Sequence, residues 1–283
     1  MTDLFDFDKP ARYAVMGNPI QHSKSPRIHS LFAQQTGQNI EYSTIQVDPG
    51  GLEQAIGNFQ ASGGKGLNIT VPFKRTAWEL MDELSDRARL AGAVNTILFR
   101  GEERFGDNTD GIGLIRDLRD NHGIPLAGRH LLLLGAGGAA RGVLAPLLDQ
   151  RPARLVIANR TPHRAEELAA DFRAQGAVHG CGFPALEGKR FHLVINATAA
   201  SLAGELPPLP DHLLHDDACC YDMMYGAEPT PFLRWAERHG AGSCIDGLGM
   251  LVEQAAESFY LWRNVRPETK PVIETLRGEL KQE

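Results

Sequence analysis

The segment Asn68–Lys74 combines residue types that could perform acid–base chemistry on a polar substrate. On a strand, Asn68 and Thr70 would point to one face and the apolar residues at 69, 71 and 73 to the other. Pro72 cannot donate to a sheet, so we expect the strand to stop there and Lys74 to lie in a loop at its carboxyl end. A lysine can release and regain a proton, which arginine cannot. Lys74 is therefore a candidate acid/base, although a surface lysine at a strand end would look the same.

Two later segments, Ala93–Thr96 and Asp107–Gly111, add polar groups at the ends of short apolar runs. Asn95 supplies an amide, and Asp107 and Asp110 supply carboxylates. Together with Lys74, these groups could bind hydroxyls and transfer a proton. We expect them to share one site.

Serines that precede a helix indicate an anion site near the amino terminus. The loop 18–26 follows an expected strand at 12–17, and Pro26 is a favourable first-turn residue. Ser23 and Ser25 would then lie where hydroxyl and free N–H groups can hold a carboxylate. Simple N-capping of the helix by Ser25 would give the same pattern.

The middle of the chain carries a glycine-rich turn typical of dinucleotide binding. The apolar run 131–134 is expected to be a strand, Gly135–Ala140 follows it directly, and a helix should start around Arg141. Gly135 permits the tight turn, and Gly137 allows the backbone to approach a pyrophosphate. The strand before the turn and the helix after it separate this pattern from an isolated glycine motif.

The next expected strand, 155–158, is followed by Asn159, Arg160 and, one turn on, Arg164. An NAD site carries an acid at this strand end for the ribose hydroxyls, whereas arginine suits the 2′-phosphate of NADP. The pattern therefore favours NADP. Solvated charges at a helix start are the alternative.

Strands and helices alternate along the chain, which indicates an α/β fold with mostly parallel strands and ligands at the strand ends. A glycine turn at Asp246–Met250 precedes a helix over 251–262, and Gln254 on its first turns is a ligand candidate or an ordinary exposed residue. The remaining expected elements are strands at 40–47 and 193–195, a strand that ends within 220–225, helices at 52–62, 75–91 and 267–281, and a hairpin across 94–106.

Composition limits the classes of function. The chain has 283 residues, 42% hydrophobic and 23% charged, which suits one large domain or two of ordinary size. A net charge of −6 argues against nucleic-acid partners and anionic membranes. No apolar run reaches the roughly 18 residues of a membrane span, and the acidic first eight residues lack the basic start of a signal peptide. We therefore expect a cytoplasmic protein that binds a small molecule.

The four cysteines show no framework spacing, as expected for reduced thiols. Four possible metal ligands lie close in sequence: His212, His215, Cys219 and Cys220. No second ligand pair of zinc-site spacing accompanies them, so we expect no metal.

Together the motifs resemble the shikimate dehydrogenase family over nearly the whole chain. The segments that carry the resemblance, in a specific order and spacing, are 17–20, 23–26, 68–74, 92–96, 107–111, 135–139, 159–161, 221–223 and 246–250. The resemblance implies a two-domain α/β protein with its active site in the cleft between the domains. It implies a discontinuous substrate-binding domain, residues 1–110 with 248–283, and a Rossmann-type NADP-binding domain at 111–247.

The resemblance also assigns roles by position. Ser23 and Ser25 would hold the substrate carboxylate, and Lys74 would be the acid/base paired with Asp110. The other substrate-binding candidates are Asn68, Thr70, Asn95, Tyr225 and Gln254. The cofactor candidates are Gly135, Ala136, Gly137, Gly138 and Ala139 at the pyrophosphate, Asn159, Arg160, Thr161 and Arg164 at the adenosine phosphate end, Met223 and Gly247 at the nicotinamide, and in addition Thr198 and Asp86.

The reaction implied is the reversible, NADP-dependent reduction of 3-dehydroshikimate to shikimate in aromatic amino acid biosynthesis. The alternatives are a quinate/shikimate dehydrogenase with broader substrate or NAD use, a methylenetetrahydrofolate dehydrogenase, and a non-catalytic NADP sensor. The folate enzyme does not fit the Ser23 and Ser25 loop, and a sensor has no use for Lys74 with Asp110. Ala199 and Ala200 stand where relatives often carry serines, which leaves a hydroxyl contact from that loop to the cofactor open. Monomer and homodimer are both open.

Overall fold

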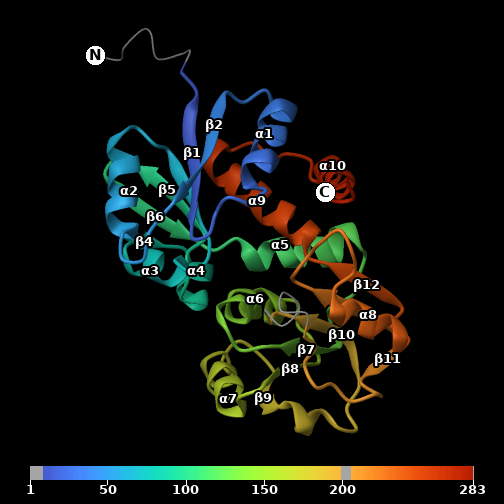
Figure 1. Ribbon diagram of the computed structural model, residues 1–283. Coiled ribbons are helices and arrows are strands. Elements are labelled where there is room, and N and C mark those ends of the chain that lie inside the picture. Colours follow the sequence, from blue (N-terminus) through green and yellow to red (C-terminus); the bar gives the residue numbers. More distant parts are fainter. Residues whose placement is uncertain (1–8, 199–204, 283) are drawn as a thin grey trace. The chain divides into compact units, whose positions relative to one another are not determined.

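The computed structural model describes residues 9–198 and 205–282, which form two compact units, each with one six-stranded sheet (Figure 1). The first unit consists of residues 1–109 and 254–272, and the second of 110–253 and 273–283. The chain passes between the units at 253–254 and at 272–273, and these two boundaries fall inside the helices α9 (Leu248–Arg263) and α10 (Lys270–Leu280). The assignment of substrate to residues 1–110 and 248–283, and of cofactor to 111–247, concerns ligands and stays a prediction.

The first unit has a mixed sheet in the order β2-β1-β3-β5-β6-β4. Strands β1, β2 and β3 are parallel, whereas β5 runs antiparallel to β3 and β6. The β5–β6 pair confirms the hairpin expected across 94–106. Its elements are β1 (Ala11–Gly17), α1 (Ser25–Thr36), β2 (Ile40–Gln46), α2 (Leu52–Ala61), β3 (Gly66–Ile69), α3 (Lys74–Glu79), β4 (Glu83–Leu84), α4 (Asp86–Ala91), β5 (Thr96–Arg100) and β6 (Glu103–Asp107).

Helices α2 and α1 lie on opposite sides of this sheet (Figure 1). Ile56 of α2 packs in one core with Leu67 of β3, while Phe32 of α1 meets Phe259 of α9 edge to face at 5.7 Å. Trp262 of α9 donates its indole N–H to the Ile97 carbonyl at 3.0 Å. The α9 helix is thereby fixed to the sheet that carries the substrate candidates.

The single helix expected over 75–91 is wrong, because α3 and α4 are separated by the short strand β4. Glu83 of β4 pairs with Phe105 of β6, and the Ser85 hydroxyl then caps α4 by accepting the Ala88 N–H at 3.1 Å. Pairing with a distant strand thus outweighs the local helix propensity of the segment.

The strand before Pro72 is also shorter than expected. It ends at Ile69, and Lys74 begins α3 instead of lying in a loop. The Phe73 N–H donates to the Thr70 carbonyl at 3.0 Å, which forms a turn at the strand end. Because the alternation stops with the strand, the side chain at 71 is 64% exposed although its neighbours at 69 and 73 are buried.

The second unit has a parallel sheet in the order β12-β11-β10-β7-β8-β9. The direction of chain progression reverses between β7 and β10, which is the switch point of a Rossmann-type sheet. The expected α/β fold with such a unit is confirmed. Its elements are α5 (Asp110–Arg116), a π-helix (Asp117–Asn121), β7 (His130–Leu134), α6 (Gly138–Asp149), β8 (Arg154–Asn159), α7 (Pro162–Asp171), β9 (Val178–Gly182), a 3-10 helix (Phe183–Leu186), β10 (Phe191–Asn196), β11 (Leu214–Asp222), α8 (Pro231–Arg238) and β12 (Ser243–Asp246).

Both faces of this second sheet are buried. Leu133 of β7 belongs to the core that includes Val143 of α6, whereas Leu132 belongs to the core that includes Phe232 of α8. Burial on both faces explains why the strands are continuous apolar runs in the sequence.

Within the described part of the chain, no helix is long and apolar enough to cross a membrane. All four cysteines are free thiols. Burial raises the pKa of Cys219 to about 11, so this thiol is not a nucleophile at neutral pH.

His29 of α1 is a fully buried histidine in the first unit. Its ring stacks on Tyr42 with centroids 4.2 Å apart and planes 8° from parallel. Neither ring nitrogen has a hydrogen-bond partner among the described residues. Burial lowers the pKa of His29 to about 3, because a charged imidazolium would lose its hydration.

We expect the first unit to lose stability as the pH falls from about 6.5 toward 3. The folded-state pKa of His29, about 3, lies below its ordinary value of 6.5, so the unfolded chain binds the extra proton in this interval. The contribution of neutral His29 to the free energy of unfolding is fully present above pH 6.5. It falls by about 1.4 kcal/mol per pH unit below that value, which amounts to about 2 kcal/mol at pH 5. Urea unfolding at pH 7 and pH 5, followed by tryptophan fluorescence, to which Trp78 and Trp262 of the first unit contribute, measures this loss.

The variant His29→Phe should be much less sensitive to this pH change, because an aromatic ring stays in place without a titrating group. The matched variant of an exposed histidine, His22→Phe, should keep the wild-type sensitivity. An equal loss of stability in all three proteins would assign the acid sensitivity to other groups.

Candidate active site

Asn68 on β3 is the centre of a buried amide network in the first unit. Its Oδ1 accepts the Tyr42 hydroxyl at 2.7 Å, and its Nδ2 donates to the Asn95 carbonyl and to Ser258 Oγ, both at 3.1 Å. Both amide hydrogens therefore have partners within the protein. The network fixes β3 to α9, and the expected contact of Asn68 with substrate stays a prediction.

Asn95 and Gln254 meet although they lie 159 positions apart in the sequence. Asn95 Nδ2 donates to Thr109 Oγ1 at 2.9 Å and to Gln254 Oε1 at 3.3 Å, and its Oδ1 accepts the Thr109 N–H at 2.9 Å. Gln254 is half-buried, so the alternative of an ordinary exposed helix residue is wrong. Amide groups held in this way suit the recognition of hydroxyl groups, since they both donate and accept.

Sequence reasoning missed two members of this cluster, Thr109 and Ser258. The Ser258 hydroxyl lies 2.7 Å from Thr96 Oγ1 and donates to the Gln254 carbonyl at 3.1 Å. A signal was present, because Gln254 and Ser258 are four residues apart and thus share one face of a largely apolar helix.

Ser23 and Ser25 flank the start of α1. The N-cap of this helix is Lys24, with no side-chain capping bond, so the alternative that Ser25 caps the helix is wrong. The Ser25 N–H donates to Ser23 Oγ at 3.3 Å. A helix start beside two hydroxyls and a lysine is a suitable setting for a carboxylate.

Lys74 is the first residue of α3 and is half-buried. Its carbonyl accepts the Val94 N–H at 2.8 Å, and Phe73, buried in the core, precedes it. The backbone at Lys74 is therefore fixed on both sides. Lys74 belongs to the first unit, whereas Asp110 begins α5 of the second, and their pairing stays a prediction.

A charge network that the sequence did not indicate supports the Asp107–Gly111 motif. The Asp107 carboxylate is buried and accepts Arg87 Nε at 2.6 Å and the Ser85 hydroxyl at 2.6 Å. Arg87 also pairs with Glu257 of α9 at 3.2 Å. The ion pairs fix the end of β6, from which Thr109 follows.

Asp86 has a local structural role in the first unit. Its side chain is 96% exposed and pairs with Arg89 at 2.8 Å in the first turn of α4. An acid at this position favours the helix amino terminus. Its expected contact with the cofactor stays a prediction.

The glycine turn of the second unit leaves its backbone open to a ligand. Gly135 has φ 103°, and a Cβ there would lie 3.0 Å from Thr198 Cγ2. Side chains at Gly137 or Gly138 would meet no atom within 4 Å, and the 12-residue helix α6 has no side-chain cap. The helix begins at Gly138, earlier than the expected start near Arg141, so its free N–H groups belong to the glycine turn. This arrangement fits a pyrophosphate.

The ends of β10 and β11 are tied together beside the switch point. Thr198 Oγ1 donates to Asn196 Oδ1 at 2.7 Å, and the Met223 N–H donates to the Asn196 carbonyl at 3.0 Å. Asn196 also donates to the buried Asp222 at 3.2 Å. Thr198 and Met223 are thereby positioned at the carboxyl ends of these strands. Residues 199–204 lie outside the described part of the chain. Whether the loop with Ala199 and Ala200 makes a hydroxyl contact to the cofactor therefore stays open.

Arg160 and Arg164 are exposed beyond the carboxyl end of β8. Neither guanidinium forms an ion pair with any residue that the structure describes. The turn is shaped by Asn159 Nδ2, which donates to the Thr161 carbonyl at 2.9 Å. Two such guanidinium groups at this strand end fit a phosphate monoester better than a diol. The alternative of solvated charges is tested by substitution, as described in the Discussion.

Gly247 allows two backbone segments of the second unit to touch. A Cβ there would lie 2.2 Å from the Met223 carbonyl oxygen, and the Gly247 N–H donates to the Met224 carbonyl at 3.1 Å. Arg277 of α10 forms a bidentate ion pair with Asp246, which precedes the turn. Tyr225 lies half-buried shortly after Met224, and its expected contact with substrate stays a prediction.

The variant Gly247→Ala should destabilise the second unit by about 2 kcal/mol, within the usual cost of overpacking, and weaken NADP⁺ binding. The matched variant Gly278→Ala should stabilise by about 0.5–1 kcal/mol, since it lies in α10, where an added Cβ would meet no atom within 4 Å. Thermal melts and NADP⁺ titrations of both variants check this. If Gly247→Ala and Gly278→Ala changed stability in the same direction, close backbone contact would not be the reason for a glycine at position 247.

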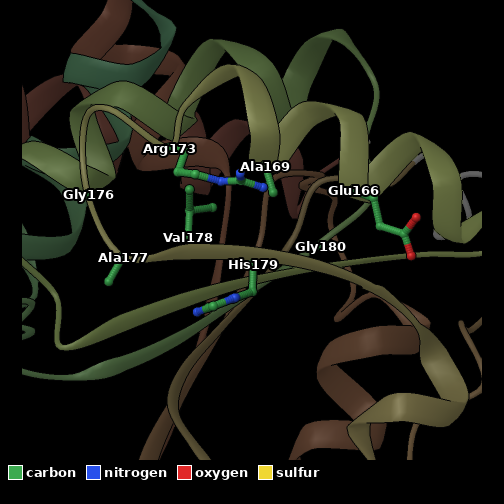
Figure 2. Close-up of a pocket in the computed structure, with 8 residues that line it drawn as sticks. All are labelled: Glu166, Ala169, Arg173, Gly176, Ala177, Val178, His179 and Gly180. Carbon is green, nitrogen blue, oxygen red and sulfur yellow. The ribbon is translucent and has the colours of Figure 1, made fainter.

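A separate hollow lies between α7 and β9 (Figure 2). Figure 2 shows Glu166 and His179 directed away from each other on opposite sides of the β9 backbone. Its lining contains none of the expected site residues. We therefore do not assign the reaction to this hollow.

Comparison with known proteins gives matches along most of the chain. Residues 15–97 match the family described as Shikimate dehydrogenase substrate binding domain, 118–203 that described as Shikimate / quinate 5-dehydrogenase, and 247–277 that described as Shikimate 5'-dehydrogenase C-terminal domain. The chain is 60% identical over 272 residues to shikimate dehydrogenase (NADP(+)) of Methylococcus capsulatus, with 96% of this chain and 98% of that protein covered.

Two further relatives extend this comparison. Shikimate dehydrogenase (NADP(+)) of Alkalilimnicola ehrlichii is 61% identical over 268 residues, with 95% of this chain and 99% of that protein covered. The crystal structure of shikimate 5-dehydrogenase from Thermus thermophilus in complex with NADP(H) and shikimate has a TM-score of 0.85 at 33% identity, covering 95% of this chain and 100% of that one.

Proposed function

Because this chain belongs to the shikimate dehydrogenase family, we propose that it catalyses the NADP-dependent, reversible reduction of 3-dehydroshikimate to shikimate. The observation that supports this most directly is the pair of sites that the chain builds. One unit carries Lys74 and a fixed cluster of amides and hydroxyls, and the other carries an uncapped glycine turn followed by two exposed arginines.

We assign the substrate to the first unit. Ser23 and Ser25 would hold its carboxylate at the start of α1. Asn95 and Gln254, which already hydrogen-bond each other, would bind the ring hydroxyls together with Thr70. Asn68 and Tyr225 would lie close by, and Asn68 would act mainly by fixing β3.

We assign the cofactor to the second unit. The turn formed by Gly135, Ala136, Gly137, Gly138 and Ala139 would hold the pyrophosphate at the start of α6. The adenosine phosphate would meet Asn159, Arg160, Thr161 and Arg164, and the nicotinamide would lie near Thr198, Met223 and Gly247. When bound, NADPH supplies the hydride for the carbonyl carbon.

Lys74 would act on the oxygen of that carbonyl. As negative charge develops on this oxygen, the Lys74 ammonium group stabilises it and delivers a proton, and in shikimate oxidation the neutral amine takes the proton back. Such general acid–base catalysis contributes about 10²–10⁴-fold to rate. Asp110 would orient the ammonium group.

The strongest alternative is a dehydrogenase that accepts quinate or uses NAD. Two exposed arginines at the end of β8 favour NADP, because an NAD site would be expected to carry an acid there. A cytoplasmic location, the absence of nucleic-acid partners, a reaction that needs no metal, and a monomeric or homodimeric state stay predictions.

The test is to follow nicotinamide absorbance with the purified protein, pairing shikimate or quinate with NADP⁺ or NAD⁺. Fast turnover with shikimate and NADP⁺ alone is expected. Comparable rates with quinate or NAD⁺ would indicate a broader enzyme and weaken the arginine argument. Measurable NADP⁺ binding without turnover in any combination would favour a cofactor sensor over an enzyme.

A further inference from the structure

Three histidines lie together at the amino ends of three adjacent strands in the second unit. His130 is the first residue of β7, His192 the second of β10 and His215 the second of β11, and the sheet order is β11-β10-β7. The glycine turn, Thr198 and Met223 follow the carboxyl ends of these strands. The three histidines therefore belong to the opposite edge of the sheet.

Strand register brings these histidines together. Leu193 pairs with Leu131, so the residues before them, His192 and His130, face each other across β10 and β7. On the other side a bulge shifts the register: Phe191 pairs with Leu214, but Leu193 pairs with Cys219. The pairing of Phe191 with Leu214 brings the next residues, His192 and His215, side by side, and their rings stack.

The geometry is that of a possible ligand set. One ring nitrogen from each histidine lies within 4.8 Å of the others, and the rings of His192 and His215 stack at 4.0 Å. No described carboxylate forms an ion pair with any of the three.

We propose that His130, His192 and His215 form a binding site for a divalent transition-metal ion such as Zn²⁺ or Ni²⁺. Neutral imidazole is a preferred ligand of these ions, and three histidines with a water in a fourth position make a familiar tetrahedral set. The sequence indicated no metal, because these ligands come from different strands: His130 and His192 alone are 62 positions apart. His215 lies with His130 and His192, and not with Cys219 and Cys220, which the sequence had placed beside it as possible metal ligands.

Binding requires a limited rearrangement. With metal–nitrogen distances of about 2.0–2.1 Å, tetrahedral ligand nitrogens are about 3.4 Å apart, so nitrogens now within 4.8 Å of one another must approach by at most roughly 1.4 Å. His130 is exposed and the other two are half-buried, which leaves room for rotation. The His130 N–H now donates to His192 Nδ1 at 3.2 Å, and this long bond is lost whichever nitrogen of His192 binds the ion. Water can replace it, since His130 lies at the surface.

The inferred site is independent of the proposed reaction. Strand β7 separates His130 from Gly135 by about 16 Å at the usual rise per residue. A bound ion would connect β7, β10 and β11 and stabilise the second unit, without contact with the cofactor turn. Its presence or absence is therefore measurable whatever the substrate.

The experiment is calorimetric titration of untagged, chelator-stripped protein with Zn²⁺, with thermal melts in parallel. We expect one saturable site and a rise in Tm. The variants His130→Gln, His192→Gln and His215→Gln should each weaken binding at least tenfold and lose the Tm rise. The matched control His163→Gln, which removes an exposed histidine on α7, should bind like wild type.

A second measurement does not depend on variants that fold. Zn²⁺ should shift the side-chain nitrogen resonances of these three histidines in wild-type protein and leave those of the other seven unchanged. The absence of saturable binding, shifts at other histidines, or wild-type affinity in a folded variant lacking all three would each overturn the proposal.

Discussion

Replacing Lys74 with alanine should lower kcat for shikimate oxidation by about 10²–10⁴-fold and raise KM only modestly. The expected effect is large because the substrate hydroxyl must lose a proton as hydride leaves its carbon, and Lys74 is the group proposed to accept it. The backbone at Lys74 is fixed by the Val94 hydrogen bond, which the substitution leaves in place. Steady-state rates with saturating NADP⁺ measure the effect.

Two further variants separate proton transfer from simple charge. Lys74→Arg keeps a positive charge but provides a group that does not deprotonate, so its kcat should stay close to that of the alanine variant. Lys65→Ala removes an exposed lysine of the same unit and should leave both constants unchanged. A large rise in KM with kcat intact in Lys74→Ala would make Lys74 a binding residue.

The double variant Arg160→Ala with Arg164→Ala should raise KM for NADP⁺ by about 10²-fold and leave KM for NAD⁺ nearly unchanged. Hydrogen bonds to charged groups contribute about 1.5–3 kcal/mol each, and both guanidinium groups are expected to contact the 2′-phosphate that NAD⁺ lacks. Neither forms an ion pair with the described residues, so their removal should leave stability unchanged. KM measured with both cofactors at constant ionic strength checks this.

Arg173→Ala is the matched control for this pair. It removes another exposed arginine, just beyond the end of α7 beside the hollow in Figure 2, and should change neither cofactor constant. An equal rise in KM for NADP⁺ and NAD⁺ in the double variant would place the arginines at the pyrophosphate, which both cofactors contain. No loss for either cofactor would favour the solvated-charge alternative.

The sequence alone indicated the α/β fold, the family and the cofactor turn. These features depend on residues that are close in sequence. Glycines between an apolar strand and a helix fix the local backbone, and the arginines follow directly after the next strand. Strand 131–134, strand 155–158 and the 94–106 hairpin lie where expected because their apolar patterns match their own burial.

The tertiary structure decided what depends on distant partners. Pairing of β4 with β6 divided the helix expected over 75–91, and the turn after β3 placed Lys74 at a helix start. The Asn95–Gln254 contact and the histidine cluster join side chains far apart in the chain, one through packing of α9 and the other through strand register. Local patterns specify the elements and their turns, whereas the contacts between elements follow from how all of them bury their apolar faces together.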